Sequence, residues 1–365
     1  MFSNFRMRPF GEFPLSQDDS NMDLAQEGML LWGGGGAALP VNSVLPIISG
    51  TVQVGQTLTT TDGTWSGSPT FTYQWKRGGV NIGGATANTY ALVLADIGAV
   101  ITVTVTATNA AGSASATSAG TTAVIVPPPA VTANLTWDFD PRVGLFTTNV
   151  GSTPSTADGD PVGRAEDQSG AGRNITQATA GKRATLKLSQ VNGLPAVLFD
   201  GTDDVLVSAA ALSTIITTNA YSMYVVFYPN VINTNNANTY QNDAVISDQM
   251  GGFWGLALKS TPVACAYNFD TTDDHADIAI SLGAFQLIHQ RHDAGNLVIS
   301  KNGGSETSVA SGPTGAVVAT FGLGKDIGTD FFDGMIARIL VYNVAHNATD
   351  KNATIAYLKT LYNLP

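Results

Sequence analysis

Two aspartates two residues apart, Asp138 and Asp140, have the spacing that places both carboxyl groups on one face of a β-strand. A pair of carboxyl groups can cleave a glycosidic bond, because one donates a proton while the other acts as base or nucleophile. This pair falls on the first strand expected in its domain, and we interpret it as a structural edge. The glutamates are too scattered to supply another pair: Glu12, Glu27, Glu166 and Glu306. We therefore expect no catalytic residue and no enzymatic activity.

The histidines cluster once, in the segment His289–Asp293. A Ser–His–Asp hydrolase needs a histidine within hydrogen-bonding distance of its nucleophile. On a strand, residues three apart face opposite sides, so His289 and His292 cannot converge on one substrate or metal ion. The residues Asp293–Asn296 have the composition of a hairpin turn. The sequence therefore favours a polar strand end here.

Two acidic segments raise the question of Ca²⁺, which takes ~6–8 oxygen ligands. Asp200–Asp204 holds three aspartates just after an expected strand. A second loop holds four carboxyl groups within eight residues: Asp270, Asp273, Asp274 and Asp277. Such crowding is repulsive unless the groups are solvated or share a cation. The glycine-anchored spacing of a calcium loop is absent, so solvated acids are favoured, and Ca²⁺ is retained as a candidate cofactor.

Several side chains near expected strand ends have the chemistry of a sugar-binding surface, where an exposed aromatic ring stacks on the sugar and planar polar groups bind its hydroxyls. The candidates are Trp254, Tyr267, Asn268, Arg291 and His292. Each is equally compatible with a place in the core or on an ordinary surface. The sequence alone leaves both interpretations open.

The composition places these residues in an all-β protein. Charged residues make up 12% of the chain against a typical ~25%, 39 of the 365 residues are glycine, and 44% are hydrophobic. The net charge of −11 disfavours nucleic acid and anionic lipid as partners. No segment reaches the ~18 apolar residues of a membrane helix, so we expect no membrane insertion. The start of the chain lacks the apolar run of a signal peptide, so we expect any release from a cell to follow another route, such as lysis.

Two composition breaks divide the chain, the flexible run Gly33–Gly36 and the stiff spacer Pro127–Pro129. The expected parts are an extended arm, a domain, a linker and a larger domain: residues 1–40, 41–126, 127–130 and 131–365. The arm has no strand pair or long helix that could bury its large aromatic residues. These residues are therefore expected to anchor the arm to a partner surface: Phe2, Phe5, Phe10, Phe13 and Trp32.

Residues 41–126 contain short alternating runs separated by turn residues, which predicts a β-sandwich. The expected strands are Thr51–Val54, Gln56–Thr60, Thr70–Arg77, Thr89–Leu94, Val100–Thr108 and Ala119–Val126. The region resembles a bacterial immunoglobulin-like domain over nearly its whole length: Trp75 in YQWKR matches the buried core tryptophan, and Asp96–Gly98 matches the turn before a later strand. It departs from that pattern in having no cysteine pair and in carrying an aliphatic residue, Val100 or Ile101, at the corner tyrosine.

Residues 131–365 predict a second, larger set of strands followed by one short helix. After Asn347, a suitable N-cap, Ile355, Leu358 and Tyr362 share one helix face. Five segments in order resemble the laminin-G and concanavalin-A-like lectin superfamily: AEDQSGAGRNITQATAGKRATL, GLPAVLFDGTDDVL, YSMYVVFYP, DGMIARILVYNVAHNATD and IAYLKTLYNL. The resemblance implies a concanavalin-A-like jelly-roll sandwich and is not specific for a ligand.

The combination of cysteine-free immunoglobulin-like and lectin-like domains with an aromatic arm resembles the virion accessory proteins of tailed bacteriophages. The resemblance implies a non-enzymatic fibre, spike or decoration protein, a homo-oligomer exposed on the surface of the virion. Its arm would bind capsid, neck or tail proteins, and its tip would adhere to a host-surface glycan. A bacterial surface adhesin or carbohydrate-binding module is the first alternative, and a glycan hydrolase or lyase is the second.

Overall fold

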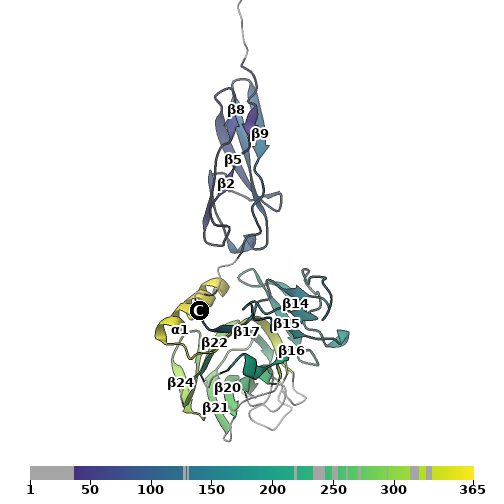
Figure 1. Cartoon of the computed structure of the whole chain (residues 1–365), viewed down its shortest axis with the longest axis vertical. Helices are drawn as coiled ribbons and strands as arrows, with labels where there is room; N and C mark the ends of the chain where they lie inside the picture. Colours follow the sequence, from purple (N-terminus) through teal and green to yellow (C-terminus); the bar gives the residue numbers. More distant parts are fainter. Residues whose placement is uncertain are drawn as a thin grey trace, which may run out of the picture.

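The protein folds as two β-sandwiches stacked along its long axis (Figure 1). The computed structural model describes residues 37–125, 129, 131–217, 220–232, 243–248, 254–259, 262–269, 273–293, 295–312, 320–325 and 331–365. The N-terminal sandwich comprises residues 37–125, and the C-terminal sandwich comprises the described residues from 131 to 365. The predicted all-β class with a short C-terminal helix is confirmed. Residues 1–36 of the predicted arm lie outside the described part of the chain.

Small antiparallel sheets build the N-terminal sandwich, in the orders β1-β4, β2-β3-β7 and β6-β5-β8-β9. Their bounds are β1 (Asn42–Val44), β2 (Ile48–Ser49), β3 (Thr57–Thr60), β4 (Thr64–Trp65), β5 (Thr70–Arg77), β6 (Val80–Asn81), β7 (Thr89–Ala91), β8 (Ile101–Asn109) and β9 (Gly112–Thr117). Alternation in β8 buries Ile101, Val103 and Val105 and leaves the threonines between them more exposed. Trp75 is fully buried in this core, as predicted, and its indole N–H donates to the Ala87 carbonyl at 2.8 Å.

The last residues of the N-terminal sandwich run along its end nearest the C-terminal sandwich and do not form a strand (Figure 1). The prediction of a strand over residues 119–126 is wrong, because residues 123–125 form only isolated bridges, each to a different segment: Val100, Ile97 and Gln53. A 3-10 turn, η1 (Leu94–Asp96), precedes Ile97 at the same end. These residues form the surface that meets the C-terminal sandwich.

Two large sheets build the C-terminal sandwich in the described part of the chain. The first has the order β14-β15-β26-β17-β22-β23-β24, with β10 also paired to β26, and the second has the order β11-β12-β13-β16-β25-β18-β19-β20-β21. The bounds for the first sheet are β10 (Leu135–Phe139), β14 (Thr185–Val191), β15 (Leu194–Asp200), β17 (Tyr221–Val231), β22 (Gln286–Asp293), β23 (Asn296–Lys301), β24 (Glu306–Ala310) and β26 (Asp333–Tyr342). Those for the second are β11 (Leu145–Phe146), β12 (Arg164–Ala165), β13 (Ile175–Thr176), β16 (Leu206–Ala211), β18 (Ala244–Asp248), β19 (Trp254–Lys259), β20 (Val263–Phe269), β21 (Asp273–Ala279) and β25 (Thr320–Leu323), and η2 (Ala180–Lys182) and η3 (Leu212–Thr214) are short 3-10 turns.

The first sheet of the C-terminal sandwich is covered on both faces. Its inner face packs on the second sheet through a large apolar core that includes Trp137, Phe139 and Phe321. Its outer face is covered by α1 (Ala348–Tyr362), which buries Leu358 and Tyr362 against it. The Asn347 side chain accepts a hydrogen bond from the Asp350 N–H at 2.9 Å, so the predicted N-cap is confirmed. No helix in the described parts of the chain is long and apolar enough to cross a membrane.

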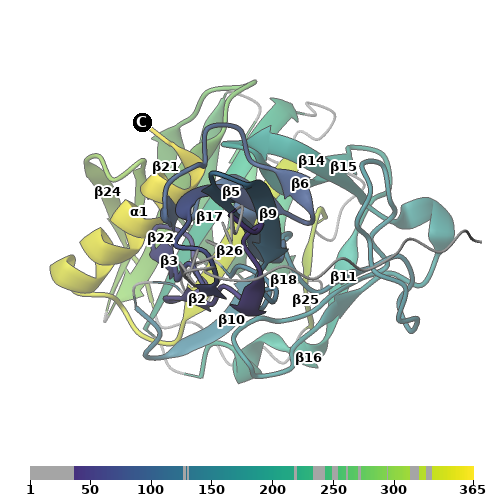
Figure 2. The ribbon, with the colours of Figure 1, turned by 90° about the horizontal axis from the view of Figure 1, so that it is seen from above.

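The N-terminal sandwich stands over the outer face of this first sheet, beside α1 (Figure 2). Ile97 of the N-terminal sandwich packs against the apolar cluster that α1 forms with β17 and β26. The two sandwiches therefore contact each other over this outer face, and charged residues of that face line a cavity between them.

Candidate functional site

The strand pair β10 and β26 carries a cluster of charged side chains on the outer face of the first sheet. Trp137 and Phe139 of β10 are buried in the core between the sheets, so alternation places Asp138 on the opposite face. β10 pairs antiparallel with β26, which brings Asp138 opposite Leu340 and close to Arg338. Asp140 follows directly after β10, and Arg142 follows two residues later.

Four side chains form a buried ion network, which we call the junction cluster: Asp138, Asp140, Arg142 and Arg338. Arg338 donates from Nη2 to Oδ2 of Asp138 at 2.8 Å and from Nη1 to Oδ2 of Asp140. Arg142 donates to both carboxylate oxygens of Asp140, at 2.6 Å from Nε and 2.5 Å from Nη2. Asp140 is therefore held by two guanidinium groups, and Asp138 by one.

This difference in partners separates the acidities of the two carboxyl groups. Burial raises the pKa of Asp138 to about 6, and the charge of Arg338 offsets only part of this rise. Burial acts in the same direction on Asp140, but Arg338 and Arg142 outweigh it and hold its pKa below the ordinary value. Asp140 therefore stays ionised, while Asp138 changes charge close to neutral pH.

Three polar atoms of the junction cluster are buried without a hydrogen-bond partner among the described residues: Oδ1 of Asp138, Nη1 of Arg142 and Nε of Arg338. The first is an acceptor and the other two are donors. Nearly all buried polar atoms in proteins are paired with protein or water, so three orphans in one cluster indicate a place for a further partner.

All four residues of the junction cluster line a cavity of about 380 Å³ between the two sandwiches, which we call the junction cavity. Gln168 and Val143 complete its wall on the C-terminal sandwich. The facing wall is apolar and comes from the N-terminal sandwich and the linker: Ile97, Gly98, Ala123, Val124, Ile125 and Pro129. The volume lies within the range of small-molecule sites, ~300–1,000 Å³.

The side chains predicted to bind sugar do not form an exposed platform. Trp254 and Tyr267 are 1% and 0% exposed and belong to the interior of the C-terminal sandwich, so a sugar cannot stack on either ring in this structure. Arg291 is engaged in ion pairs with Asp293 and Glu306. Asn268 lies on β20, opposite Asp274 of β21, and its side chain is outside the described part of the structure.

The prediction of a polar strand end at the histidine cluster is corrected. His289 and His292 lie on opposite faces of β22, as expected, but both are 1% exposed. β22 lies between β17 and β23 and is covered on both faces, which the sequence of this strand alone does not reveal. His289 stacks on Tyr224 and His292 on Tyr221, with ring centroids 4.7 and 6.0 Å apart. The predicted hairpin is present, since Asp293 pairs with Asn296.

The predicted acidic loop at residues 270–277 is largely a strand. β21 begins at Asp273, so Asp274 and Asp277 are three residues apart and face opposite sides, where they cannot share one cation. Asp274 accepts a hydrogen bond from the Gly312 N–H at 3.0 Å, and Asp277 pairs with Lys259 at 2.5 Å. Asp270 lies outside the described residues, as does the side chain of Asp273.

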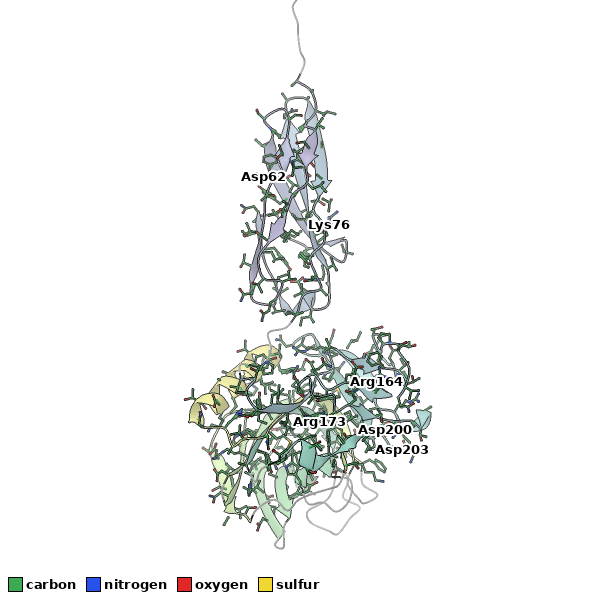
Figure 3. The ribbon with its side chains drawn as sticks, in the orientation of Figure 1. Asp62, Lys76, Arg164, Arg173, Asp200 and Asp203 are labelled. Atoms are coloured by element: carbon green, nitrogen blue, oxygen red, sulfur yellow. The ribbon has the colours of Figure 1, made fainter. Side chains whose placement is uncertain are left out.

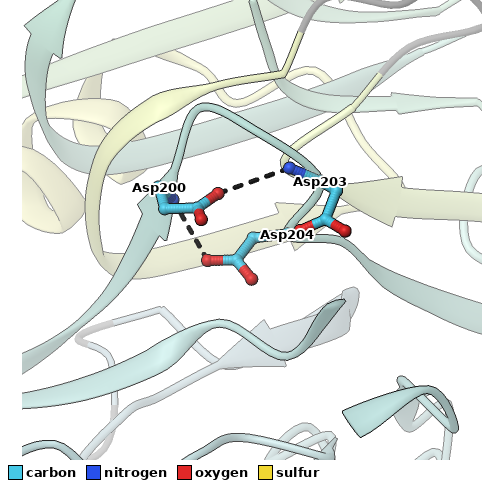
Figure 4. Close-up of side chains that lie close together, drawn as sticks. All are labelled: Asp200, Asp203 and Asp204. Atoms are coloured by element: carbon cyan, nitrogen blue, oxygen red, sulfur yellow. Dashed lines mark hydrogen bonds between the residues drawn. The ribbon is translucent and has the colours of Figure 1, made fainter. Parts of the chain in front are cut away.

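The other acidic segment does bring its carboxyl groups together. Carboxylate oxygens of Asp200, Asp203 and Asp204 all lie within 4.8 Å of one another at the turn after β15 (Figure 4). This turn lies on the side of the C-terminal sandwich, away from the N-terminal sandwich (Figure 3). Asp204 accepts from the Asp200 N–H at 3.1 Å, and burial, with the charge of Asp200, raises its pKa to about 6. Carboxylate oxygens are ligands that Ca²⁺ prefers. In this turn, however, Asp204 accepts from the Asp200 N–H and Asp200 accepts from the Asp203 N–H, so both carboxyl groups already stabilise the turn itself.

The spacing of Asp138 and Asp140 is visible in the sequence, where we interpreted it as a structural edge, whereas the parts played by Arg142 and Arg338 were not predicted. The available signal was Arg142, two residues after Asp140 and therefore within reach of it. Arg338 is 200 residues from Asp138 and left no local signal. The residues predicted to anchor the arm all lie outside the described residues: Phe2, Phe5, Phe10, Phe13 and Trp32.

Comparison with protein-family models finds no match to this chain. Comparison with curated proteins also finds none. Among solved structures, domain 4 of a GH43 extracellular arabinanase from Geobacillus stearothermophilus, in complex with arabinotriose, is 14% identical over 56% of this chain and 100% of that one, with a TM-score of 0.37. An arabinofuranosidase complexed with arabinofuranosyl-α-1,2-xylobiose is 16% identical over 55% of this chain and 51% of that one, with a TM-score of 0.42. A Trypanosoma rangeli sialidase is 9% identical over 86% of this chain and 53% of that one, with a TM-score of 0.42, so the match spans about half the length of both enzymes.

These comparisons correct one expectation from the sequence. The predicted absence of enzymatic activity is wrong by this comparison, because the similar structures include an arabinofuranosidase and a sialidase, which are glycoside hydrolases. None of the three structures described above is a phage protein, so they give no support to the predicted virion role.

Proposed function

We propose that this protein binds carbohydrate, in the manner of a carbohydrate-binding module or surface adhesin, and that the junction cavity is its sugar site. One observation carries the proposal. A cavity of ligand size has three buried hydrogen-bonding atoms without partners on one wall and an apolar surface on the other. Pockets of this kind, mostly apolar with a few fixed polar groups, are typical of small-molecule sites.

The two walls suit the two kinds of surface that a sugar presents. Hydroxyl groups both donate and accept hydrogen bonds, so one ligand can satisfy Oδ1 of Asp138 and the free N–H groups of Arg142 and Arg338. The C–H face of a sugar ring can pack against Ile97 and Val124 on the opposite wall. Because the walls belong to different sandwiches, binding requires both.

A second candidate function, glycoside hydrolysis, is favoured by one specific observation. The environments of Asp138 and Asp140 displace their pKa values in opposite directions, which is the pattern of a carboxyl pair divided between acid and base roles. Asp138 would donate its proton to the leaving glycosidic oxygen. Water would then add to the sugar carbon from which that oxygen departs, and the proton that this water loses would return to Asp138. Asp140 is held by two arginines and would act as a fixed negative charge beside the reacting atoms.

The anchoring arm, its capsid, neck or tail partners, the homo-oligomer and the exposed place on a virion stay predictions. They depend on residues outside the described structure and on neighbours that this chain does not contain. The adhesin interpretation needs none of them, since its sugar site lies within the described residues.

The proposal is tested with the full chain applied to immobilised polysaccharides, including arabinan, with separate assays for retention and for new reducing ends. We expect retention by the unaltered protein and loss of retention in Asp138→Ala. The matched control is Asp62→Asn, at a distant carboxyl of the N-terminal sandwich where an amide oxygen can still accept from the Tyr73 hydroxyl. Retention that survives Asp138→Ala unchanged would place sugar binding elsewhere, and steady release of reducing ends would establish hydrolysis.

A further inference from the structure

We propose that the junction cavity selects a neutral sugar that presents two adjacent hydroxyl groups and rejects sugars that carry a carboxylate. This inference rests on the proposed function, because it names the class of carbohydrate that the same site takes. It follows from how the junction cluster distributes its charges and its free hydrogen-bonding atoms.

The first step is the charge balance of the cavity wall. Two arginines and two aspartates line it, and both aspartates are ionised above pH 6, so the formal charges cancel there. Both arginines are already committed, since Arg338 donates to both carboxyl groups and Arg142 donates twice to Asp140. No guanidinium is left to neutralise the charge of an acidic ligand.

The second step is the geometry of the donors that remain. A carboxylate is bound most strongly by two parallel N–H groups of one guanidinium. Here the free nitrogen atoms belong to different arginines, Nη1 of Arg142 and Nε of Arg338. Separate single donors match separate hydroxyl oxygens better than they match the two oxygens of one carboxylate.

The third step is the free acceptor. Oδ1 of Asp138 has no partner among the described residues and needs a group that donates. An ionised carboxylate has no proton to donate, and its charge is repelled at this position. A hydroxyl donates to Oδ1 of Asp138 and, through its oxygen, accepts from an N–H group, so two adjacent hydroxyls can satisfy the acceptor and both donors together.

The experiment is isothermal titration calorimetry of the full chain with matched pairs of methyl glycosides: glucose with glucuronic acid, galactose with galacturonic acid, and arabinose with its 2-deoxy counterpart. We expect at least one neutral glycoside to bind and its acidic counterpart to bind about tenfold more weakly or not at all, because a hydrogen-bonded charged group would be left unpaired. Removal of one adjacent hydroxyl should weaken binding by a similar factor.

Asp138→Asn is the matched variant, because its amide keeps the shape of the carboxyl group and removes its charge. We expect it to narrow the difference between the neutral and the acidic glycoside, and Asp62→Asn to leave that difference unchanged. The comparison of neutral with acidic sugars uses the unaltered chain, so it does not depend on how the variant folds.

The outcomes separate this inference from the proposed function. Equal or tighter binding of the acidic sugar, lost in Arg142→Ala, would overturn the inference and keep a sugar site in the cavity. Absence of binding by every glycoside would overturn both.

Discussion

The two sandwiches treat a buried carboxyl group in opposite ways. In the N-terminal sandwich, Asp96 is fully buried and both its oxygens are used: Oδ1 accepts from Arg77 at 2.7 Å, and Oδ2 accepts from the Tyr90 hydroxyl at 2.9 Å and the Val93 N–H at 2.8 Å. In the C-terminal sandwich, Asp138 is almost as buried, but Oδ1 has no partner among the described residues.

This difference indicates what each group is for. A closed network such as that of Asp96 fixes a turn and has no capacity left for a ligand. An open network on a cavity wall keeps hydrogen-bonding capacity at the cost of leaving buried polar atoms unpaired. We therefore interpret Asp96 as structural and Asp138 as a binding residue, and substitutions can test this contrast.

The largest effect is expected at Arg338, which links both aspartates of the junction cluster. Arg338→Met should lower the stability of the C-terminal sandwich by about 3–5 kcal/mol. The buried carboxyl group of Asp138 would lose its guanidinium partner, and that of Asp140 would keep only Arg142. Calorimetric melting of the full chain should show one transition fall while that of the N-terminal sandwich stays in place. Arg183→Met is the control, since Arg183 donates only to backbone carbonyls of Gln177 and Ala178. A loss below about 1 kcal/mol would mean that water already solvates the cluster.

Asp96 gives the next largest effect, in the other sandwich. Asp96→Ala should cost the N-terminal sandwich about 2–3 kcal/mol, since it leaves the Tyr90 hydroxyl and the Val93 N–H without their acceptor. Arg77 is a third exposed and can turn to water, so its share is small. Denaturant unfolding measures this loss, with Asp62→Ala, which removes one hydrogen bond to Tyr73, as the milder control.

His289 offers a pH-dependent version of the same test. Burial, with the nearby charges of Arg291 and Lys351, lowers its pKa from 6.5 to about 3, so the folded state disfavours its protonation. Stability from the neutral histidine is complete above pH 6.5 and falls as the pH drops toward 3, by about 2 kcal/mol between pH 7 and pH 5. His289→Gln should remove this loss, measured as the difference between variant and unaltered protein at each pH.

The difference between proteins is needed because other groups act with the opposite sign. The pKa values of Asp138 and Asp204 are raised to about 6, so their protonation stabilises the folded state as the pH falls from 6 toward 4. An identical pH profile in His289→Gln and the unaltered chain would show that this ring is hydrated in solution.

Much of the fold could be predicted from local sequence. Alternation identified the strand that contains Ile101 and Val103, the YQWKR segment identified the buried Trp75, and Asn347 identified the start of α1. Each of these features depends on residues that are neighbours in the chain. The prediction of a polar strand end at His292 failed because the burial of this residue depends on the order of strands in the sheet. The sequence of a single strand does not encode that order.

The candidate site could be predicted only in part, for the same reason. The Asp138 and Asp140 spacing is local and was visible, but its meaning depends on Arg338, 200 residues away from Asp138. The apolar wall of the junction cavity comes from the other sandwich, at residues such as Ile97 and Val124. No pattern near Asp138 reports that contact.

A direct test of the contrast is expected to give only a small change in stability. Asp138→Asn should alter the melting of the C-terminal sandwich by less than about 1 kcal/mol, because burial already disfavours the ionised carboxyl group at this position. The same substitution should weaken sugar retention. A loss of stability as large as that of Asp96→Ala, without a change in retention, would make Asp138 structural and remove the contrast.

The smallest effect is expected at the turn after β15, which brings three carboxyl groups together without an arginine. In the presence of a chelator, Asp203→Asn should raise the stability of the C-terminal sandwich by about 0.5 kcal/mol, because it removes one of three like charges near a partly exposed surface. Thermal melting with chelator and then with added Ca²⁺ measures this. A decrease in stability under chelator would mean that the Asp203 carboxylate supports the turn itself. A rise in the melting temperature of the unaltered chain on addition of Ca²⁺, absent in Asp203→Asn, would show that a cation binds the carboxyl groups of this turn. The cation would then neutralise them as the arginines neutralise the carboxyl groups of the junction cluster.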